Sequence, residues 1–92
     1  EHRAAAPQIY AALKAGVEFS RTAPVAQTER FVIERIDSDP LLKVEYFQSV
    51  NADTLLPLDQ WREGVATRGC AAVQAGAVRL IDNVGGYGPY DK

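Results

Sequence analysis

Few side chains in this 92-residue chain are able to transfer protons, attack a substrate or bind a metal ion. His2 is the only histidine, and it stands at the end of the chain, where a side chain is hardest to hold for catalysis or metal binding. Cys70 is the only cysteine and lies among alanines, which favours a buried, inert thiol over a nucleophile. These two residues cannot assemble a four-ligand zinc site. We therefore assign no catalytic and no metal-binding residue.

Arg79 and Asp82 are the charged pair that stands out in the C-terminal half. Because they are three residues apart in a predicted strand, their side chains should point to opposite faces, and each needs a partner from elsewhere in the fold. For Arg79 we favour bracing of a carbonyl or carboxylate, and leave direct contact with substrate open. The other candidate acids fall at a helix end or in loops, where capping and turn formation explain them: Asp37, Asp39, Asp53 and Asp59.

The glycine-rich run at residues 85–88 is followed by no predicted helix, so it lacks the strand-before, helix-after context that makes a glycine loop cradle phosphate. We expect residues 85–92 to form a flexible tail and residues 1–84 to form a single domain. No cofactor-binding residue is assigned.

Two amphipathic helices should come first, because apolar side chains recur at three- and four-residue spacing in residues 3–19 and 25–36. Proline is tolerated in a first helical turn, so the well-formed part of the first helix should begin near Pro7. Thr22 is the expected N-cap of the second helix, and residues 38–40 should end it.

A two-residue period replaces the helical one after residue 41, which predicts a half-buried strand. One face should carry Leu42, Val44, Tyr46 and Val50. Phe47 interrupts the polar face, and we favour a packing role for it over a binding role. Asp53 is suited to an Asx turn after this strand, and residues 58–63 are expected to form a loop. Residues 66–75 and 78–84 should then form two strands of a hairpin that turns at Gly76. The sequence therefore predicts an α+β fold with two helices packed on one face of a small three-stranded antiparallel sheet.

Composition limits the partners of this domain. Apolar residues make up 47% of the chain and charged residues 24%, which is typical of a folded globular domain. The net charge of -2 argues against nucleic acid and against anionic membranes as partners. No signal peptide is apparent, and a single cysteine suits a reducing cytoplasm. Because the chain begins at Glu1 and contains no methionine, we expect it to be a piece of a longer protein.

Three motifs follow one another in an order that a known family shares. They are Glu1-His2-Arg3-Ala4-Ala5-Ala6-Pro7-Gln8-Ile9-Tyr10, then Val44-Glu45-Tyr46 with Val50-Asn51-Ala52-Asp53-Thr54-Leu55, and then Gly76-Ala77-Val78-Arg79-Leu80-Ile81-Asp82-Asn83. They resemble the Glu-x-Arg-x-x-Ala-Pro-x-Leu-Tyr start, the strand with its Ala-Asp-Thr-Leu turn, and the Gly-x-x-Arg-Leu-Ile-Asp-Asn ending of the C-terminal domain of pantothenate synthetases, also called pantoate-β-alanine ligases.

The resemblance implies the smaller, C-terminal domain of an enzyme that condenses pantoate with β-alanine in pantothenate biosynthesis. Such enzymes are cytoplasmic homodimers that use ATP with magnesium to form a pantoyl-adenylate, and they belong to the coenzyme A pathway. Their catalytic N-terminal domain carries His-x-Gly-His and Ser-Ser-Arg-Asn motifs, and neither motif occurs here. The resemblance therefore implies a lid over an active site held by that partner domain, inactive alone and without a cofactor of its own. No catalytic residue of the family can be carried onto this sequence.

The alternative is a stand-alone binding or regulatory module that kept the fold without catalysis. An independent small enzyme is less favoured, because no convergent set of polar groups is evident. This sequence departs from the family at residues 68–72, which are smaller and more polar than the usual strand, and at the glycine-rich C-terminal segment.

Overall fold

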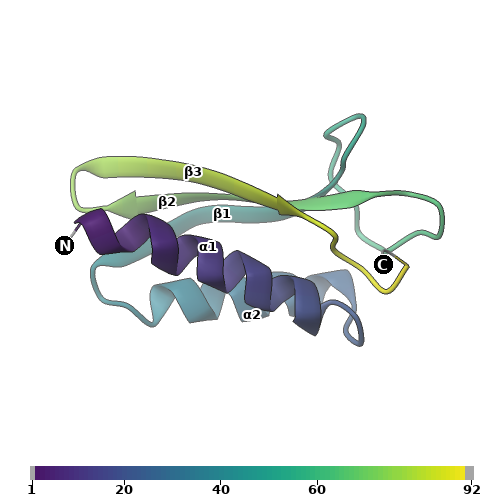
Figure 1. The fold of residues 1–92 in the computed structure, drawn as a ribbon, viewed down its shortest axis with the longest axis horizontal. Helices are drawn as coiled ribbons and strands as arrows, with labels where there is room; N and C mark the ends of the chain where they lie inside the picture. The colour runs from purple at the N-terminus through teal and green to yellow at the C-terminus, as the bar shows by residue number, and fades with distance from the viewer. Residues whose placement is uncertain (1, 91–92) are drawn as a thin grey trace.

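The computed structural model describes the backbone of residues 2–90 and the side chains of residues 5–90. The elements are α1 (His2–Phe19), α2 (Val25–Asp37), β1 (Leu42–Asn51), β2 (Thr67–Ala75) and β3 (Val78–Gly85). The strands form one antiparallel sheet in the order β1-β2-β3, and both helices lie against the same face of it (Figure 1). The predicted α+β architecture is thereby confirmed.

Helix α1 begins at His2, so the expectation of a start near Pro7 is wrong. Proline removes only one backbone donor, and its fixed φ fits a helix. The turns on both sides of Pro7 are anchored by tertiary packing, because Ala5 is 4% exposed and Ile9 is 1% exposed in the core. Burial of this apolar face outweighs the single missing hydrogen bond.

Helix α2 is capped by Pro24 and not by Thr22, which corrects the predicted N-cap. Pro24 is extended, and its carbonyl oxygen accepts the first helical hydrogen bond from the backbone N–H of Thr28 at 3.0 Å. Thr22 lies two residues too early for its side chain to serve this end of the helix. The predicted stop is confirmed, since Ser38 is the C-cap.

Strand β1 contains a bulge that the periodicity did not reveal. Its register against β2 shifts between Val44 and Tyr46, which places Glu45 as the extra residue. Tyr46 therefore points away from the helices, and the prediction that it shares a face with Val44 is wrong. Phe47 turns inward instead and is 4% exposed in the core, so its predicted packing role is confirmed.

Strands β2 and β3 form the predicted hairpin, with Ala75 paired to Val78 across a two-residue turn. Gly76 has φ +63°, a conformation that glycine adopts without a steric cost. The small side chains of β2 let the helices approach closely, because Ala71 and Val73 are fully buried beneath them.

The segment after β3 belongs to the core, whereas we expected the domain to end at residue 84. Tyr87 is 2% exposed and inserts between α1 and β2. A Cβ atom at Gly16 would lie 2.5 Å from the Tyr87 hydroxyl, and one at Gly69 would lie 2.7 Å from the Tyr87 ring. The absence of side chains at these two glycines creates the space that the ring fills. Of the expected flexible tail, residues 91–92 lie outside the described part of the chain.

Candidate functional site

Arg79 and Asp82 lie on opposite faces of β3, as predicted, and make separate contacts. Arg79 is opposite Gln74 on the face away from the helices, and its Nε donates to Glu45 Oε1 at 2.8 Å. This hydrogen bond and the negative charge of Glu45 raise the pKa of Arg79. Asp82 accepts a hydrogen bond from the neighbouring Asn83 backbone N–H at 2.8 Å. The arrangement favours bracing of the bulged strand β1 by Arg79.

Cys70 lies on the same outer face of the sheet and is half-buried. Burial raises the pKa of its thiol, and the positive charge of Arg68 offsets part of that rise. Arg68 is held in place by Asn83, whose Oδ1 accepts hydrogen bonds from Arg68 Nε at 2.9 Å and Nη2 at 2.6 Å. The prediction of a buried thiol is wrong, since Cys70 is half-buried. Its inertness stays a prediction, and a raised pKa makes a thiol a weaker nucleophile at neutral pH.

The two aspartates near the end of α2 accept hydrogen bonds from backbone N–H groups. Asp37 Oδ1 accepts from the Val44 backbone N–H at 2.9 Å, and Asp39 Oδ1 accepts from the Leu41 N–H at 2.9 Å. The predicted turn role is confirmed for Asp39, whereas Asp37 joins the end of α2 to strand β1, which corrects its predicted capping or turn role.

The Asx turn after β1 is made by Asn51 instead of Asp53, which corrects the predicted residue. Asn51 Oδ1 accepts hydrogen bonds from the backbone N–H groups of Asp53 at 2.8 Å and Thr54 at 3.1 Å. Asn51 was missed because Asp and Asn favour the same turns, and two of them stand two positions apart here.

The glycine run of residues 85–88 holds aromatic rings in place. Gly88 lies against the ring of Trp61, and its N–H donates to Ser20 Oγ at 2.8 Å. Arg21 Nη1 donates to the carbonyl oxygens of Gly86 and Gly88 at 3.0 and 2.8 Å. The Gly88 N–H and these two carbonyl oxygens are thus engaged within the fold.

Neither a metal-binding cluster nor a membrane-spanning helix is found among the described residues. The side chain of His2 lies outside them, and among those that are described no three His, Cys, Asp or Glu residues gather closely enough to hold a metal ion. Within residues 2–90 neither helix is both long and apolar enough to cross a membrane.

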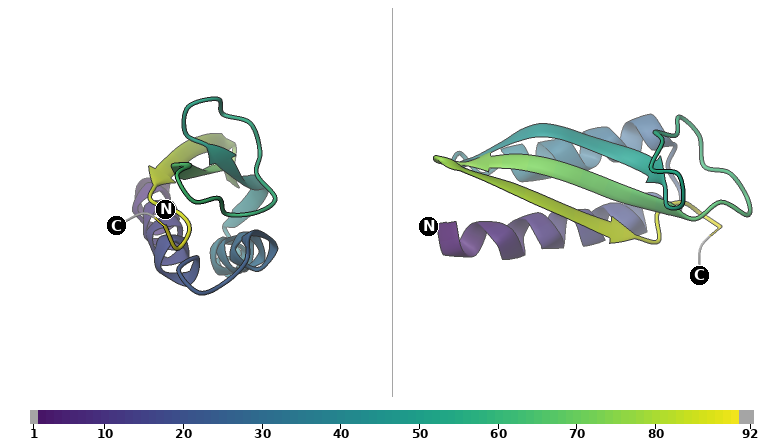
Figure 2. Two further views of the ribbon diagram at one scale, coloured as in Figure 1. Left: turned by 90° about the vertical axis from the view of Figure 1, so that its right-hand side faces the viewer. Right: turned by 90° about the horizontal axis from the view of Figure 1, so that it is seen from above.

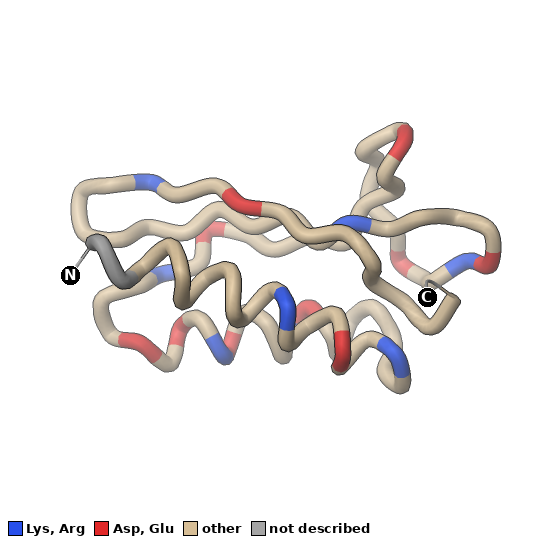
Figure 3. Tube along the Cα trace, viewed as in Figure 1, with Lys and Arg blue, Asp and Glu red and all other residues tan. Residues whose placement is uncertain are grey.

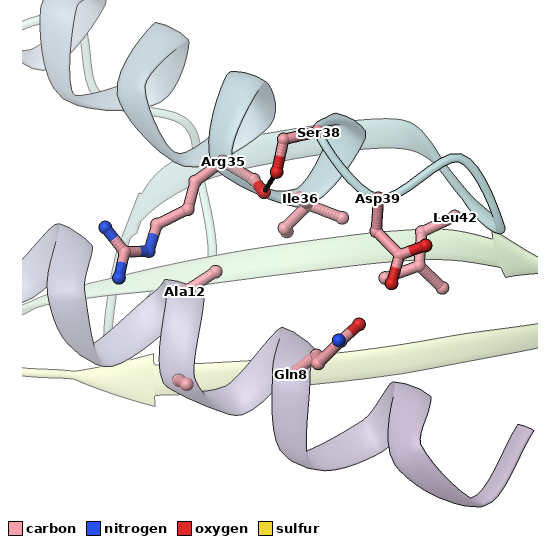
Figure 4. Close-up of a pocket in the computed structure, with 8 residues that line it drawn as sticks. Gln8, Ala12, Arg35, Ile36, Ser38, Asp39 and Leu42 are labelled. Carbon is pink, nitrogen blue, oxygen red and sulfur yellow. Dashed lines mark hydrogen bonds between the residues drawn. The ribbon is translucent and has the colours of Figure 1, made fainter. Parts of the chain in front are cut away.

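An open cleft of about 430 Å³ lies between the helices at the start of β1 (Figure 4). Gln8 of α1 reaches into it from one side, and Asp39 points into it from the turn that follows α2. Arg35 lies along its rim, with the guanidinium 5.8 Å from the centre of the Phe31 ring. The sequence gives no sign of this cleft, because its polar groups come from segments that only the packing brings together. It offers polar contacts but no paired acid and base for catalysis.

A second cleft, of about 440 Å³, follows the edge of β1. Val25 and Ala26 of α2 form one wall, and Pro57 and Leu58 form the other. Two carboxylates stand at its rim, those of Glu29 and Asp59. Glu29 is engaged within the fold, because its Oε2 accepts the Ser49 backbone N–H at 3.0 Å.

A further candidate surface is the outer face of the sheet, on the side away from both helices. Tyr46, Ala72 and Ile81 form one cross-strand row on this face, and no helix lies in front of it (right-hand view of Figure 2). Tyr46 is 40% exposed and Ile81 is 56% exposed, while Ala72 between them is fully buried. The turn after β1 rises above the sheet on this same side (Figure 1). Charges of both signs are interspersed along the chain, without a large region of one sign (Figure 3).

The fold and its surfaces define a class of protein: a small α+β domain whose candidate reactive groups, where described, serve structural roles, and whose sheet has one uncovered face. Comparison with known proteins supplies the family. Residues 1–85 match the family model described as pantoate-beta-alanine ligase. Because the match covers most of the chain, the chain belongs to the pantoate-β-alanine ligase family.

Individual relatives agree with this assignment. The chain is 40% identical over 88 residues to the pantothenate synthetase of Porphyromonas gingivalis strain W83, covering 91% of this chain and 30% of that protein. It is 41% identical over 66 residues to that of Phocaeicola vulgatus, covering 72% of this chain and 23% of that protein. The crystal structure of pantothenate synthetase from Thermus thermophilus superimposes with a TM-score of 0.77 at 36% identity, covering 94% of this chain and 31% of that one. The chain thus spans less than a third of the length of these relatives.

Proposed function

We propose that this chain is the C-terminal domain of an ATP-dependent pantoate-β-alanine ligase, in which it acts as a lid over the active site and is inactive alone. The observation that carries the proposal is the family match over residues 1–85 in a chain that spans 31% of the Thermus thermophilus synthetase. In this proposal the catalytic groups belong to the remaining part of the enzyme, outside this chain.

The ATP site belongs, in this proposal, to the partner domain. In support, the glycine run at 85–88 packs on Trp61, its carbonyl oxygens accept from Arg21, and the Gly88 N–H donates to Ser20. No cluster of acidic side chains in the described part suits magnesium either. The contribution of this chain is therefore shape and closure, with pantoate, β-alanine and ATP bound mainly by the other domain.

A lid suits the chemistry that the family name implies. In this proposal ATP activates the carboxylate of pantoate as a pantoyl-adenylate with release of pyrophosphate, and β-alanine then displaces AMP; water would hydrolyse the same intermediate. Closing a rigid domain over such an intermediate excludes water and holds the amine close to the activated carbonyl. The described domain has principal extents of 39 × 24 × 19 Å, which gives a plate broad enough to cover a small-molecule site.

We place the full-length enzyme in the cytoplasm as a homodimer, with its N-terminal catalytic domain as the partner of this chain. The support is the kinship with bacterial pantothenate synthetases.

The test is an activity measurement on a chimera in which this chain replaces the matching segment of the Thermus thermophilus synthetase. We expect AMP formation that depends on both pantoate and β-alanine in the chimera, and none from the chain alone. Activity of the chain alone would contradict the lid, and a chimera without activity would favour the alternative of a stand-alone binding or regulatory module.

A further inference from the structure

The turn that follows β1 displays two leucines to solvent. Leu55 is 65% exposed and Leu56 is 63% exposed, which makes them the most exposed large hydrophobic side chains in the described part of the chain. Neither contributes to the core. Adjacent exposed leucines on one protruding turn are a feature of surfaces that bind other protein.

This turn is held rigidly, so the exposure of its leucines is built into the fold. Asn51 organises it: its backbone oxygen accepts the Leu55 N–H at 2.8 Å, and its own N–H donates to the Leu56 oxygen at 2.9 Å. The Asn51 side chain accepts two further backbone hydrogen bonds from the same turn. The base is tied to the start of β2 by the Ala52 N–H, which donates to Ala66 at 2.9 Å.

Leu55 also adopts a costly backbone conformation. Its φ is +64°, the only positive φ at a non-glycine residue within residues 2–90. A leucine with this φ is strained because its Cβ crowds the backbone, and such strain gathers at functional surfaces. This strained conformation does not bury the Leu55 side chain against the rest of the chain, because the side chain is exposed to solvent.

The turn and the row on the outer face belong to one side of the molecule. The turn rises on the side away from the helices (Figure 1). The register of the sheet places the exposed Tyr46 and Ile81 on the same side. Two charged side chains of this face already have partners, since Arg79 pairs with Glu45 and Arg68 with Asn83. Covering it with protein would therefore bury apolar area without leaving these charged groups unpaired.

We infer that this surface, formed by Tyr46, Leu55, Leu56 and Ile81, is where the remainder of the ligase polypeptide docks on the domain. The inference rests on the proposed function. The length of the relatives indicates which protein covers this surface. The match covers 30% of the Porphyromonas gingivalis synthetase, so about 70% of that polypeptide lies outside it. A domain joined to so large a remainder needs an interface, and inter-domain interfaces typically bury about 600–1,500 Å². The opposite side of the sheet is already covered by α1 and α2, which leaves this face available.

The test is protection of introduced thiols from N-ethylmaleimide. In a Cys70→Ala background, Leu56→Cys and Ile81→Cys each place one thiol on the surface, and Tyr10→Cys is the matched control on α1, where Tyr10 is 51% exposed. Labelling rates are compared between the chain alone and the chimera with ATP and pantoate present. Circular dichroism first confirms that each variant unfolds at the same midpoint as the parent.

We expect Leu56→Cys and Ile81→Cys to be labelled about tenfold more slowly in the chimera, and Tyr10→Cys to change by less than about twofold. Equal rates at Leu56→Cys and Ile81→Cys, or protection at Tyr10→Cys instead, would overturn the inference. Protection that grows with concentration in the chain alone would also overturn it, because a second copy would then be the occupant. Ligase activity of the chimera separates the two proposals. Protection without activity would support the docking surface and contradict the lid. Activity without protection would support the lid and contradict the docking surface.

Discussion

The hydroxyl of Tyr87 donates a 2.6 Å hydrogen bond to the backbone oxygen of Leu13, and so ties the segment after β3 to the middle of α1. The two residues are 74 positions apart in the chain and both lie in the core. Around them the Tyr87 ring contacts Phe47 and Trp61, with ring centres 5.8 and 6.3 Å away. One aromatic side chain thereby joins the first helix, the sheet and the long loop after β1.

Shortening Tyr87 should destabilise the domain in two distinguishable steps. We expect Tyr87→Phe to lower the free energy of unfolding by about 1 kcal/mol, because it removes one buried hydrogen bond but keeps the ring. Tyr87→Ala should cost about 3–5 kcal/mol, since it also leaves a cavity. Urea unfolding measures both. Tyr90→Phe is the control, because Tyr90 is 50% exposed, and we expect a change within about 0.5 kcal/mol. Equal losses for Tyr87→Phe and Tyr87→Ala would contradict this account.

The domain should lose stability at alkaline pH through Tyr87. Burial raises the pKa of this phenol, so the folded state keeps a proton that the unfolded chain releases near the ordinary tyrosine pKa of about 10. Its contribution is fully present below about pH 10 and falls as pH rises further, because the unfolded state then binds fewer protons. Thermal melting between pH 8 and 11 should show this decline, and Tyr87→Phe should flatten it. An unchanged slope in Tyr87→Phe would exclude Tyr87 as the cause.

Relieving the strain at Leu55 should stabilise the isolated chain. Asparagine tolerates positive φ better than leucine, so Leu55→Asn should raise the free energy of unfolding by about 1 kcal/mol. Leu56→Asn is the matched control, since Leu56 is equally exposed and its φ is not positive. Urea unfolding of both variants is the measurement. Destabilisation by Leu55→Asn would show that the leucine side chain supports the turn and is not merely displayed by it.

The thiol of Cys70 should react slowly, and Arg68 should set how slowly. Because burial raises the thiol pKa, the pH midpoint for alkylation by iodoacetamide should lie above about 8.5, the value for a free cysteine. Arg68→Gln should move that midpoint higher still, because the positive charge of Arg68 lowers the thiol pKa. Arg79→Gln should leave it unchanged. A midpoint insensitive to Arg68→Gln would rule out this electrostatic coupling.

The architecture was predictable from the sequence because each element carries a clear period. The helical spacing of apolar residues predicted the two helices, and the small residues of β2 predicted a strand that the helices approach closely. The face of β1 was not predictable beyond Val44, because the bulge at Glu45 depends on pairing with β2 and the local pattern of apolar residues continues through it. One extra residue exchanged the roles of Tyr46 and Phe47.

The contacts between distant segments were also beyond sequence reasoning. That Arg79 needs a partner from elsewhere followed from strand geometry, but Glu45 as that partner required the register of the sheet. The glycine-rich run around Tyr87 has the composition of a mobile end, and only the space left at Gly16 and Gly69 turns it into core. For the candidate site, the family motifs supplied the assignment, while the exposed turn of Leu55 and Leu56 came from the structure alone.

The most direct test of the central claim is the ligase assay itself. AMP release is measured with ATP, pantoate and β-alanine for three proteins: this chain, the Thermus thermophilus synthetase lacking the matching segment, and the chimera that joins the two. We predict activity in the chimera only, dependent on both organic substrates. Activity in this chain alone, or equal activity with and without it, would contradict a role as the lid of a pantoate-β-alanine ligase.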